Sequence, residues 1–153
     1  MMGNIPHEDK QVNLMAGEQY TEEYQKINPL NKVPTLIDGS FHLGESSAIA
    51  KYLCTTNKEG FSQCLYPEDL KERAEVDSLL DWVQSKLYPL QADSLESLMM
   101  FKAQGKPRPE ALGEFFQVKE KKAFNEFSIL LGKKEGQYLC GDKVTLADLS
   151  AFQ

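Results

Sequence analysis

The spacing of apolar residues changes at about residue 56 of this 153-residue chain. Before that point the apolar runs are short and separated by polar residues, whereas beyond it they recur at three- and four-residue steps. The first pattern is typical of short strands and turns, and the second of amphipathic helices. The chain is therefore predicted to combine an α/β part with an all-helical part.

One hairpin is clearly predicted in the first part. Residues 35–37 and 41–43 are short apolar runs, and the sequence Asp-Gly-Ser at residues 38–40 joins them. An Asp-Gly pair in this position predicts two antiparallel strands, because glycine adopts positive φ without steric cost.

Helical and extended segments surround the hairpin. Residues 10–14 alternate and predict a strand, and residues 18–26 predict a helix or helical turn that ends before Asn28 and Pro29. Residues 45–47 open a further helix, with serine as a favoured N-cap. The pattern lapses in a polar stretch over residues 57–66, which we interpret as a linker.

The residues after the linker are predicted to be mainly helical. A start is predicted at residues 67–69, with Pro67 in the first turn, and Pro89 should kink or end the helix. Residues 91–104 are predicted to form another helical piece, and residues 105–109 a loop. The predicted buried stripe of the first of these helices comprises Val76, Leu79, Leu80, Val83, Leu87 and Tyr88.

A long helix is predicted from about residue 110 to 133, and a last one begins near Thr145. Thr145 followed by Asp148 resembles a capping box, in which hydroxyl and acid exchange bonds with the backbone. Because that helix has barely begun at Gln153, we expect the chain to be truncated. The long helix should bury Leu112, Phe116, Ala123, Phe127 and Leu130.

Composition narrows the class of protein. A net charge of -6 argues against nucleic acid or an anionic membrane as a partner, and no apolar run approaches the roughly 20 residues of a membrane helix. No signal peptide is visible, so a cytoplasmic location is expected. His7 and His42 are too isolated for metal binding. The three cysteines, without CxxC spacing, are expected to be buried free thiols: Cys54, Cys64 and Cys140.

Three blocks of sequence resemble the cytosolic glutathione transferases, and their theta-like class most. They are NPLNKVPTLIDGSFHLGESSAIAKYL (residues 28–53), LYPEDLKERAEVDSLLDW (residues 65–82) and GDKVTLADL (residues 141–149). The blocks follow the order of the family and together span most of the chain. The resemblance implies a thioredoxin-like glutathione-binding domain at residues 1–56, a linker at 57–66 and a helical domain at 67–153, both domains incomplete.

The resemblance also assigns the proline inside the hairpin's apolar run. The Val33–Pro34 bond is implied to be cis, which turns the backbone of Val33 outward to pair with the cysteinyl unit of glutathione. Glu45 is implied to hold the amine of the γ-glutamyl group, and the Ser46 hydroxyl its carboxylate, at the electropositive start of a helix. Lys32 would reach the glycyl carboxylate, and Gln19 would be a further contact.

Simpler interpretations exist for the same residues. Glu45 and Ser46 suit any helix start, Pro34 any strand edge, and Lys32 any solvated surface. Trp82 and Tyr88 could line a substrate pocket, but aromatic residues on a helical stripe more often belong to the core.

The implied activity is conjugation of glutathione to small electrophilic or halogenated compounds, by a homodimer without a metal. Family members activate the sulfur with a hydroxyl, usually a serine after the first strand. That strand, its serine and the following helix are expected to be missing here, so no catalytic residue is assigned, and the activity of the chain as given is left open. The alternative is a non-catalytic binding or assembly module of the same fold. A thiol-disulfide oxidoreductase is disfavoured, because no cysteine occupies the position that its chemistry needs.

Overall fold

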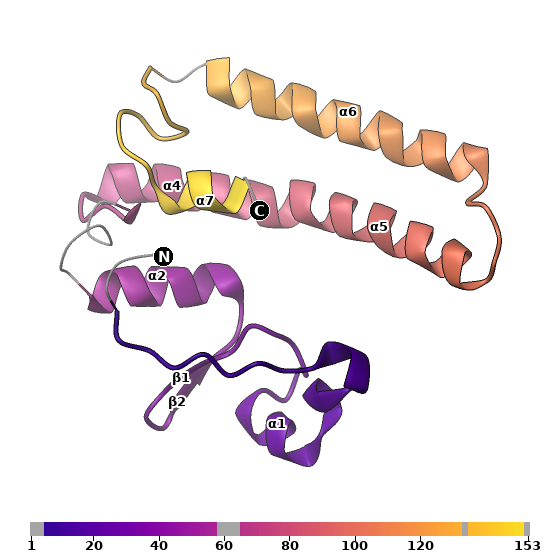
Figure 1. Cartoon of the computed structure of the whole chain (residues 1–153). Coiled ribbons are helices and arrows are strands. Elements are labelled where there is room, and N and C mark those ends of the chain that lie inside the picture. Colours follow the sequence, from indigo (N-terminus) through magenta and orange to yellow (C-terminus); the bar gives the residue numbers. More distant parts are fainter. Residues whose placement is uncertain (1–4, 58–64, 133–134, 152–153) are drawn as a thin grey trace. The chain divides into compact units, whose positions relative to one another are not determined.

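The computed structural model describes residues 5–57, 65–132 and 135–151. The chain divides into two compact units, with the boundary between Pro67 and Glu68 (Figure 1). Within the described ranges, no helix is long and apolar enough to cross a membrane.

The first unit is built around a small antiparallel hairpin. Strands β1 (Leu36–Asp38) and β2 (Phe41–Leu43) pair with Leu36 opposite Leu43 and Asp38 opposite Phe41. Gly39 has a φ of 59°, the left-handed conformation that the turn requires and that glycine adopts at no steric cost. The predicted hairpin is therefore confirmed. Its flanking elements are η1 (Leu14–Ala16), η2 (Glu18–Tyr20), α1 (Glu22–Ile27) and α2 (Ser46–Thr56).

The predicted strand at residues 10–14 is wrong. Residues 10–13 have no regular structure, and Leu14 begins the 3-10 turn η1. The Asn13 side chain accepts a hydrogen bond of 3.1 Å from the Ala16 N–H, and the Glu18 carboxylate accepts one of 2.6 Å from the Asn13 N–H. These side-chain bonds to the local backbone compete with a strand ladder, and here they favour the turn.

The second unit is helical, with α4 (Leu70–Trp82), the π-helical segment η3 (Val83–Leu87), α5 (Tyr88–Ala103), α6 (Glu110–Gly132) and α7 (Leu146–Ala151). Helix α6 packs against α5, and α7 against α4 (Figure 1). The predicted start at residues 67–69 is corrected, since Asp69 is the N-cap. Its carboxylate accepts bonds of 2.9 and 3.1 Å from the N–H groups of Lys71 and Glu72.

Pro89 was predicted to kink or end the helix, and it does not end it. The chain stays helical through α5, and the five residues before Tyr88 form a π-helical segment. Proline lacks an N–H and its ring crowds the preceding turn, so the wider turn just before it is a physically reasonable accommodation.

Burial within the second unit follows the predicted stripe closely. Val76, Leu79, Leu80, Val83 and Leu87 are all buried, as are Phe116 and Ala123 of α6. Tyr88 is the exception, at 57% exposed, because neighbouring helical positions point about 100° apart and Leu87 takes the inward direction. The predicted burial of Leu112, Phe127 and Leu130 is only partial.

The predicted capping box at Thr145 and Asp148 is half correct. The Asp148 carboxylate accepts bonds of 2.8 Å from the Thr145 N–H and 2.9 Å from its hydroxyl, so the hydroxyl donates to the acid. The other carboxylate oxygen accepts a bond of 2.8 Å from the Leu139 N–H, nine residues upstream. Asp148 thereby fastens the preceding loop to the start of α7.

Candidate functional site

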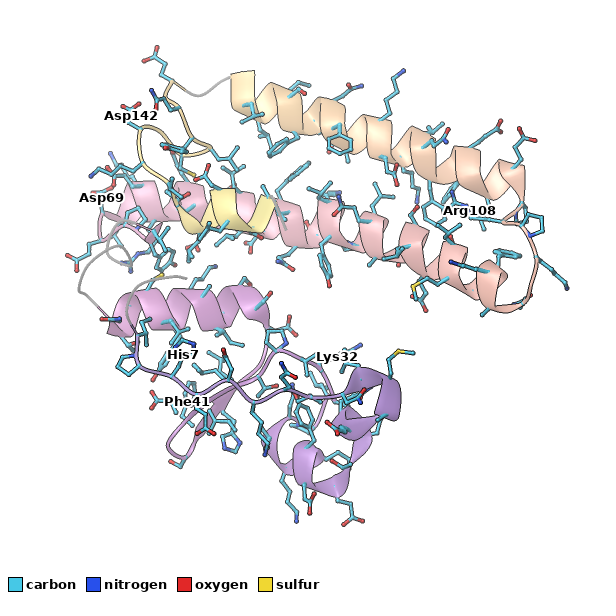
Figure 2. All side chains as sticks on the ribbon, viewed as in Figure 1. His7, Lys32, Phe41, Asp69, Arg108 and Asp142 are labelled. Atoms are coloured by element: carbon cyan, nitrogen blue, oxygen red, sulfur yellow. The ribbon has the colours of Figure 1, made fainter. Side chains whose placement is uncertain are left out.

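The open end of the hairpin brings two predicted site segments to one place. Since Leu36 pairs with Leu43, the residues just before β1 and just after β2 leave the hairpin at the same end. These are residues 32–34 on one side and residues 45–46 on the other. All five side chains are exposed. Figure 2 shows Lys32 on the loop that follows α1.

The Val33–Pro34 peptide bond is cis, as the sequence resemblance implied. Val33 is 39% exposed, and its backbone N–H and C=O have no hydrogen-bond partner within the described ranges. An exposed peptide unit of this kind can pair with an extended peptide in the manner of a β-strand.

A polar network fixes the loop just before this peptide unit. The carbonyl oxygen of Lys32 accepts hydrogen bonds from the Tyr24 hydroxyl at 2.8 Å, from Asn28 Nδ2 at 2.9 Å and from the Thr35 hydroxyl at 3.0 Å. Asn28 Nδ2 also donates to Thr35 Oγ1 at 3.0 Å, and the hydroxyls of Tyr24 and Thr35 lie 3.0 Å apart. Three side chains therefore converge on one backbone carbonyl.

This network was not predicted from the sequence. Asn28 was used only to mark the end of a helix, yet it is 7% exposed and its Oδ1 accepts a bond of 3.0 Å from the Leu30 N–H. A Cβ added at Gly44 would lie 3.5 Å from Asn28 Nδ2, which places Asn28 beside the second segment as well. An asparagine directly after a helix and before proline was the available signal.

The second segment combines backbone strain with an uncapped helix start. Glu45 has a φ of 65°, a conformation that residues with a Cβ rarely adopt and that clusters at functional sites. Its carbonyl accepts the Ile49 N–H at 2.9 Å, but its carboxylate does not cap α2. The first N–H groups of α2, at residues 46–48, precede the helical ladder and point toward the site, where they favour an anion.

Tyr52 holds α2 on the hairpin. Its hydroxyl donates a hydrogen bond of 2.6 Å to Asp38 Oδ2, and its ring lies 5.3 Å from the ring of Phe41. The bond to the Asp38 carboxylate is the main reason that the pKa of Tyr52 is raised. The start of α2 is thus oriented by contacts made along the body of the helix.

Gln19 lies on η2 and is 9% exposed, and within the described part of the chain no hydrogen bond joins it to the other predicted site residues. Its Oε1 is buried without a hydrogen-bond donor within the described ranges, as is Oδ1 of Asn31, the residue before Lys32. A buried acceptor without a donor calls for an explanation, and a bound ligand is one.

Other candidate groups do not add to this site. Burial raises the pKa of the Cys54 thiol, so Cys54 is a poor nucleophile. Trp82 stacks on Phe127 with ring centroids 5.5 Å apart, which places it among the packing contacts of α4 and α6. Among the described residues, no group of three or more His, Cys, Asp or Glu side chains could hold a metal ion. Cys64 lies outside the described residues.

Comparison with known proteins agrees with this geometry. Residues 3–55 match the profile of the glutathione S-transferase N-terminal domain, and residues 92–153 that of the glutathione S-transferase C-terminal domain. The chain is 35% identical to mouse glutathione S-transferase theta-3 over 157 residues, which covers 97% of this chain and 61% of the relative.

Solved structures give the same result. Human glutathione transferase theta-2, in complex with glutathione and an unknown ligand, superposes with a TM-score of 0.82 at 34% identity, over 97% of this chain and 60% of that one. The human theta-class enzyme in complex with the glutathione conjugate of 1-menaphthyl sulfate superposes with a TM-score of 0.79 at 34% identity. The match covers 92% of this chain and 56% of that one.

These matches define a thioredoxin-like N-terminal domain of the glutathione S-transferase type followed by a helical C-terminal domain. The chain belongs to the glutathione S-transferase family, and the relatives described above are theta-class members. It spans about three fifths of the length of the curated relatives that it matches.

Proposed function

We propose that this protein is a theta-like glutathione transferase, which binds glutathione at the open end of the hairpin and transfers it to a small electrophilic or halogenated compound. The observation that carries the proposal is the convergence there of an unpaired Val33 peptide unit with the exposed Glu45 and the uncapped start of α2.

Each part of glutathione has a chemically matched partner. The Val33 backbone would pair with the cysteinyl amide and carbonyl beside Pro34. Glu45 would hold the γ-glutamyl amine, while the Ser46 hydroxyl and the first N–H groups of α2 would hold its carboxylate. Lys32 would attract the glycyl carboxylate. The side-chain amide of Gln19 would complete the glycyl end, where its unpaired Oε1 could accept from the ligand's N–H.

Conjugation requires the thiolate of glutathione. A free thiol titrates near a pH of about 8.5, so a site that lowers this pKa raises the nucleophile concentration at neutral pH. The positive end of α2 and Lys32 act in that direction, since both favour bound negative charge. No residue of this chain is assigned as the hydroxyl donor to the sulfur. We further propose a homodimer, which the family resemblance implies, a cytosolic location, and residues 57–66 as the interdomain linker, which their polar sequence indicates.

Calorimetric titration with glutathione tests the proposal. We expect binding to the unmodified chain and at least tenfold weaker binding to Glu45→Gln, because a charge-assisted bond to the ligand amine is removed. Glu114→Gln, which removes an exposed carboxylate on α6, is the matched control and should bind as the unmodified chain does. Equal affinity of Glu45→Gln and the control would contradict the assigned site.

An assay with an aryl halide, such as 1-chloro-2,4-dinitrobenzene, separates the two functional classes. Glutathione-dependent release of the halide would establish transfer. Glutathione binding without any release would instead favour the non-catalytic binding module of the same fold.

A further inference from the structure

We propose that Tyr24 and Thr35 are positioning residues of this site, and that their hydroxyls lock the loop that presents Val33 by holding the carbonyl of Lys32. The inference rests on the proposed glutathione site. Neither hydroxyl is expected to touch glutathione, so both would act through the backbone.

The geometry makes Thr35 the centre of the lock. Its hydroxyl donates to the Lys32 carbonyl at 3.0 Å and accepts from Asn28 Nδ2 at 3.0 Å. The Tyr24 hydroxyl, 3.0 Å away, bonds the same carbonyl at 2.8 Å. If Tyr24 and Thr35 each donate to the carbonyl, and Asn28 gives one proton to the carbonyl and the other to Thr35, four of the five contacts have a proton. The contact between the Tyr24 and Thr35 hydroxyl oxygens is then a close approach without a proton of its own.

The two hydroxyls also connect separate elements. Tyr24 belongs to α1, whereas Thr35 directly follows Pro34 and precedes β1. The segment between them contains Asn31, whose φ of 57° is left-handed, so this stretch is not held by a regular ladder. Side-chain bonds to the Lys32 carbonyl therefore take over the role that a ladder would have in a strand.

The lock fixes the direction of the next peptide unit. The carbonyl of Lys32 and the N–H of Val33 belong to one planar peptide group, so holding the oxygen also sets where the Val33 N–H points. A loop without the lock would sample other directions, and glutathione would then bind only the fraction of molecules with the correct one. The expected effect is on affinity, with no change in the groups that contact the ligand.

Hydrogen exchange and glutathione titration of the full chain test the proposal. In Tyr24→Phe we expect the Asn31 amide of the same loop, which donates to the Asn28 carbonyl at 3.0 Å, to exchange about five- to tenfold faster, and glutathione to bind about five- to tenfold more weakly. Tyr20→Phe is the matched control, because Tyr20 is 65% exposed and its hydroxyl has no hydrogen-bond partner among the described residues. It should behave as the unmodified chain does.

Thr35→Val provides a second variant and a test of coupling. Because the two hydroxyls share one carbonyl, the double variant should lose less than the product of the two single losses. A purely structural role would instead lower resistance to urea without selectively speeding the exchange of any one loop amide. Unchanged exchange and affinity in Tyr24→Phe, or losses that multiply in the double variant, would overturn the positioning role.

Failure of the proposed function gives a different result. If no variant and not even the unmodified chain binds glutathione, the proposed function is contradicted. Faster exchange of the Asn31 amide in Tyr24→Phe would then still support the lock, and unchanged exchange would overturn it.

Discussion

Tyr52 on α2 donates a 2.6 Å hydrogen bond to Asp38, the last residue of β1. The bond crosses from the middle of the helix to the turn end of the hairpin, and the ring of Tyr52 rests near that of Phe41. The start of α2, where Ser46 lies, is therefore anchored at a distance from the groups that would contact a ligand.

This anchor predicts a pH dependence. The pKa of Tyr52 is raised in the folded chain, mainly by its bond to Asp38, so the folded state holds the phenol proton more tightly than the unfolded state. The contribution is fully present below the ordinary tyrosine pKa and is lost as pH rises through the folded value. Urea unfolding at pH 8 and pH 11 should show a larger alkaline loss for the unmodified chain than for Tyr52→Phe. Equal losses would contradict the assignment, and Tyr20→Phe is the control.

Because the backbone at Glu45 is strained, replacing this residue by glycine is expected to stabilise the fold and to weaken glutathione binding. Glycine accepts a φ of 65° without the steric penalty of a Cβ, so Glu45→Gly should raise the free energy of unfolding by about 0.5–1 kcal/mol. The same variant should bind glutathione at least tenfold more weakly, because the carboxylate is gone. Chemical denaturation and calorimetry measure the two effects. A less stable Glu45→Gly chain would show that the strain has another origin.

Substitution of Asp148 is expected to lower the stability of the fold strongly without touching the groups that would contact a ligand. Asp148→Ala leaves the buried N–H groups of Leu139 and Thr145 without their acceptor, which should cost about 3 kcal/mol of unfolding free energy. That is a large part of a typical total of about 5–15 kcal/mol. Asp142→Ala, in the exposed part of the same loop, should change little when both are unfolded in urea. A loss below about 1 kcal/mol for Asp148→Ala would contradict the bonding described.

Cys54 is predicted to be slow toward thiol reagents. It is 6% exposed and burial raises its pKa, so both access and thiolate content are low at neutral pH. In a chain with Cys64→Ser and Cys140→Ser, labelling at pH 7.5 should be at least tenfold slower in the folded state than in urea. Comparable rates would mean that the helix around Cys54 opens readily.

Sequence patterns predicted the elements well where one signal dominated. The hairpin followed from Asp38 and Gly39 between two short apolar runs, and the buried stripe from Val76 to Leu87 followed from helical spacing. Both depend on local backbone chemistry or on periodicity, which a single sequence displays directly. The strand expected at residues 10–14 was wrong because alternation is shared with turns, and Asn13 and Glu18 supplied bonds that favour a turn.

The candidate site was predictable only in part. Pro34, Glu45 and Ser46 were identified through resemblance to a family, and residue spacing alone would have left them as a strand edge and a helix start. The Tyr24, Asn28 and Thr35 network escaped prediction, because its members are separated in sequence by four and seven residues and meet at a backbone atom. Side-chain bonds to a carbonyl leave no periodic signature.

The most direct test of the central claim is a glutathione titration of the ¹⁵N-labelled chain followed by amide chemical shifts. The account predicts saturable shifts concentrated at Val33 and at Ser46 and Ser47, the amides that would face the ligand, with little change along α6. Shifts that are absent, or that centre on the helical unit and spare Val33 and Ser46, would contradict it.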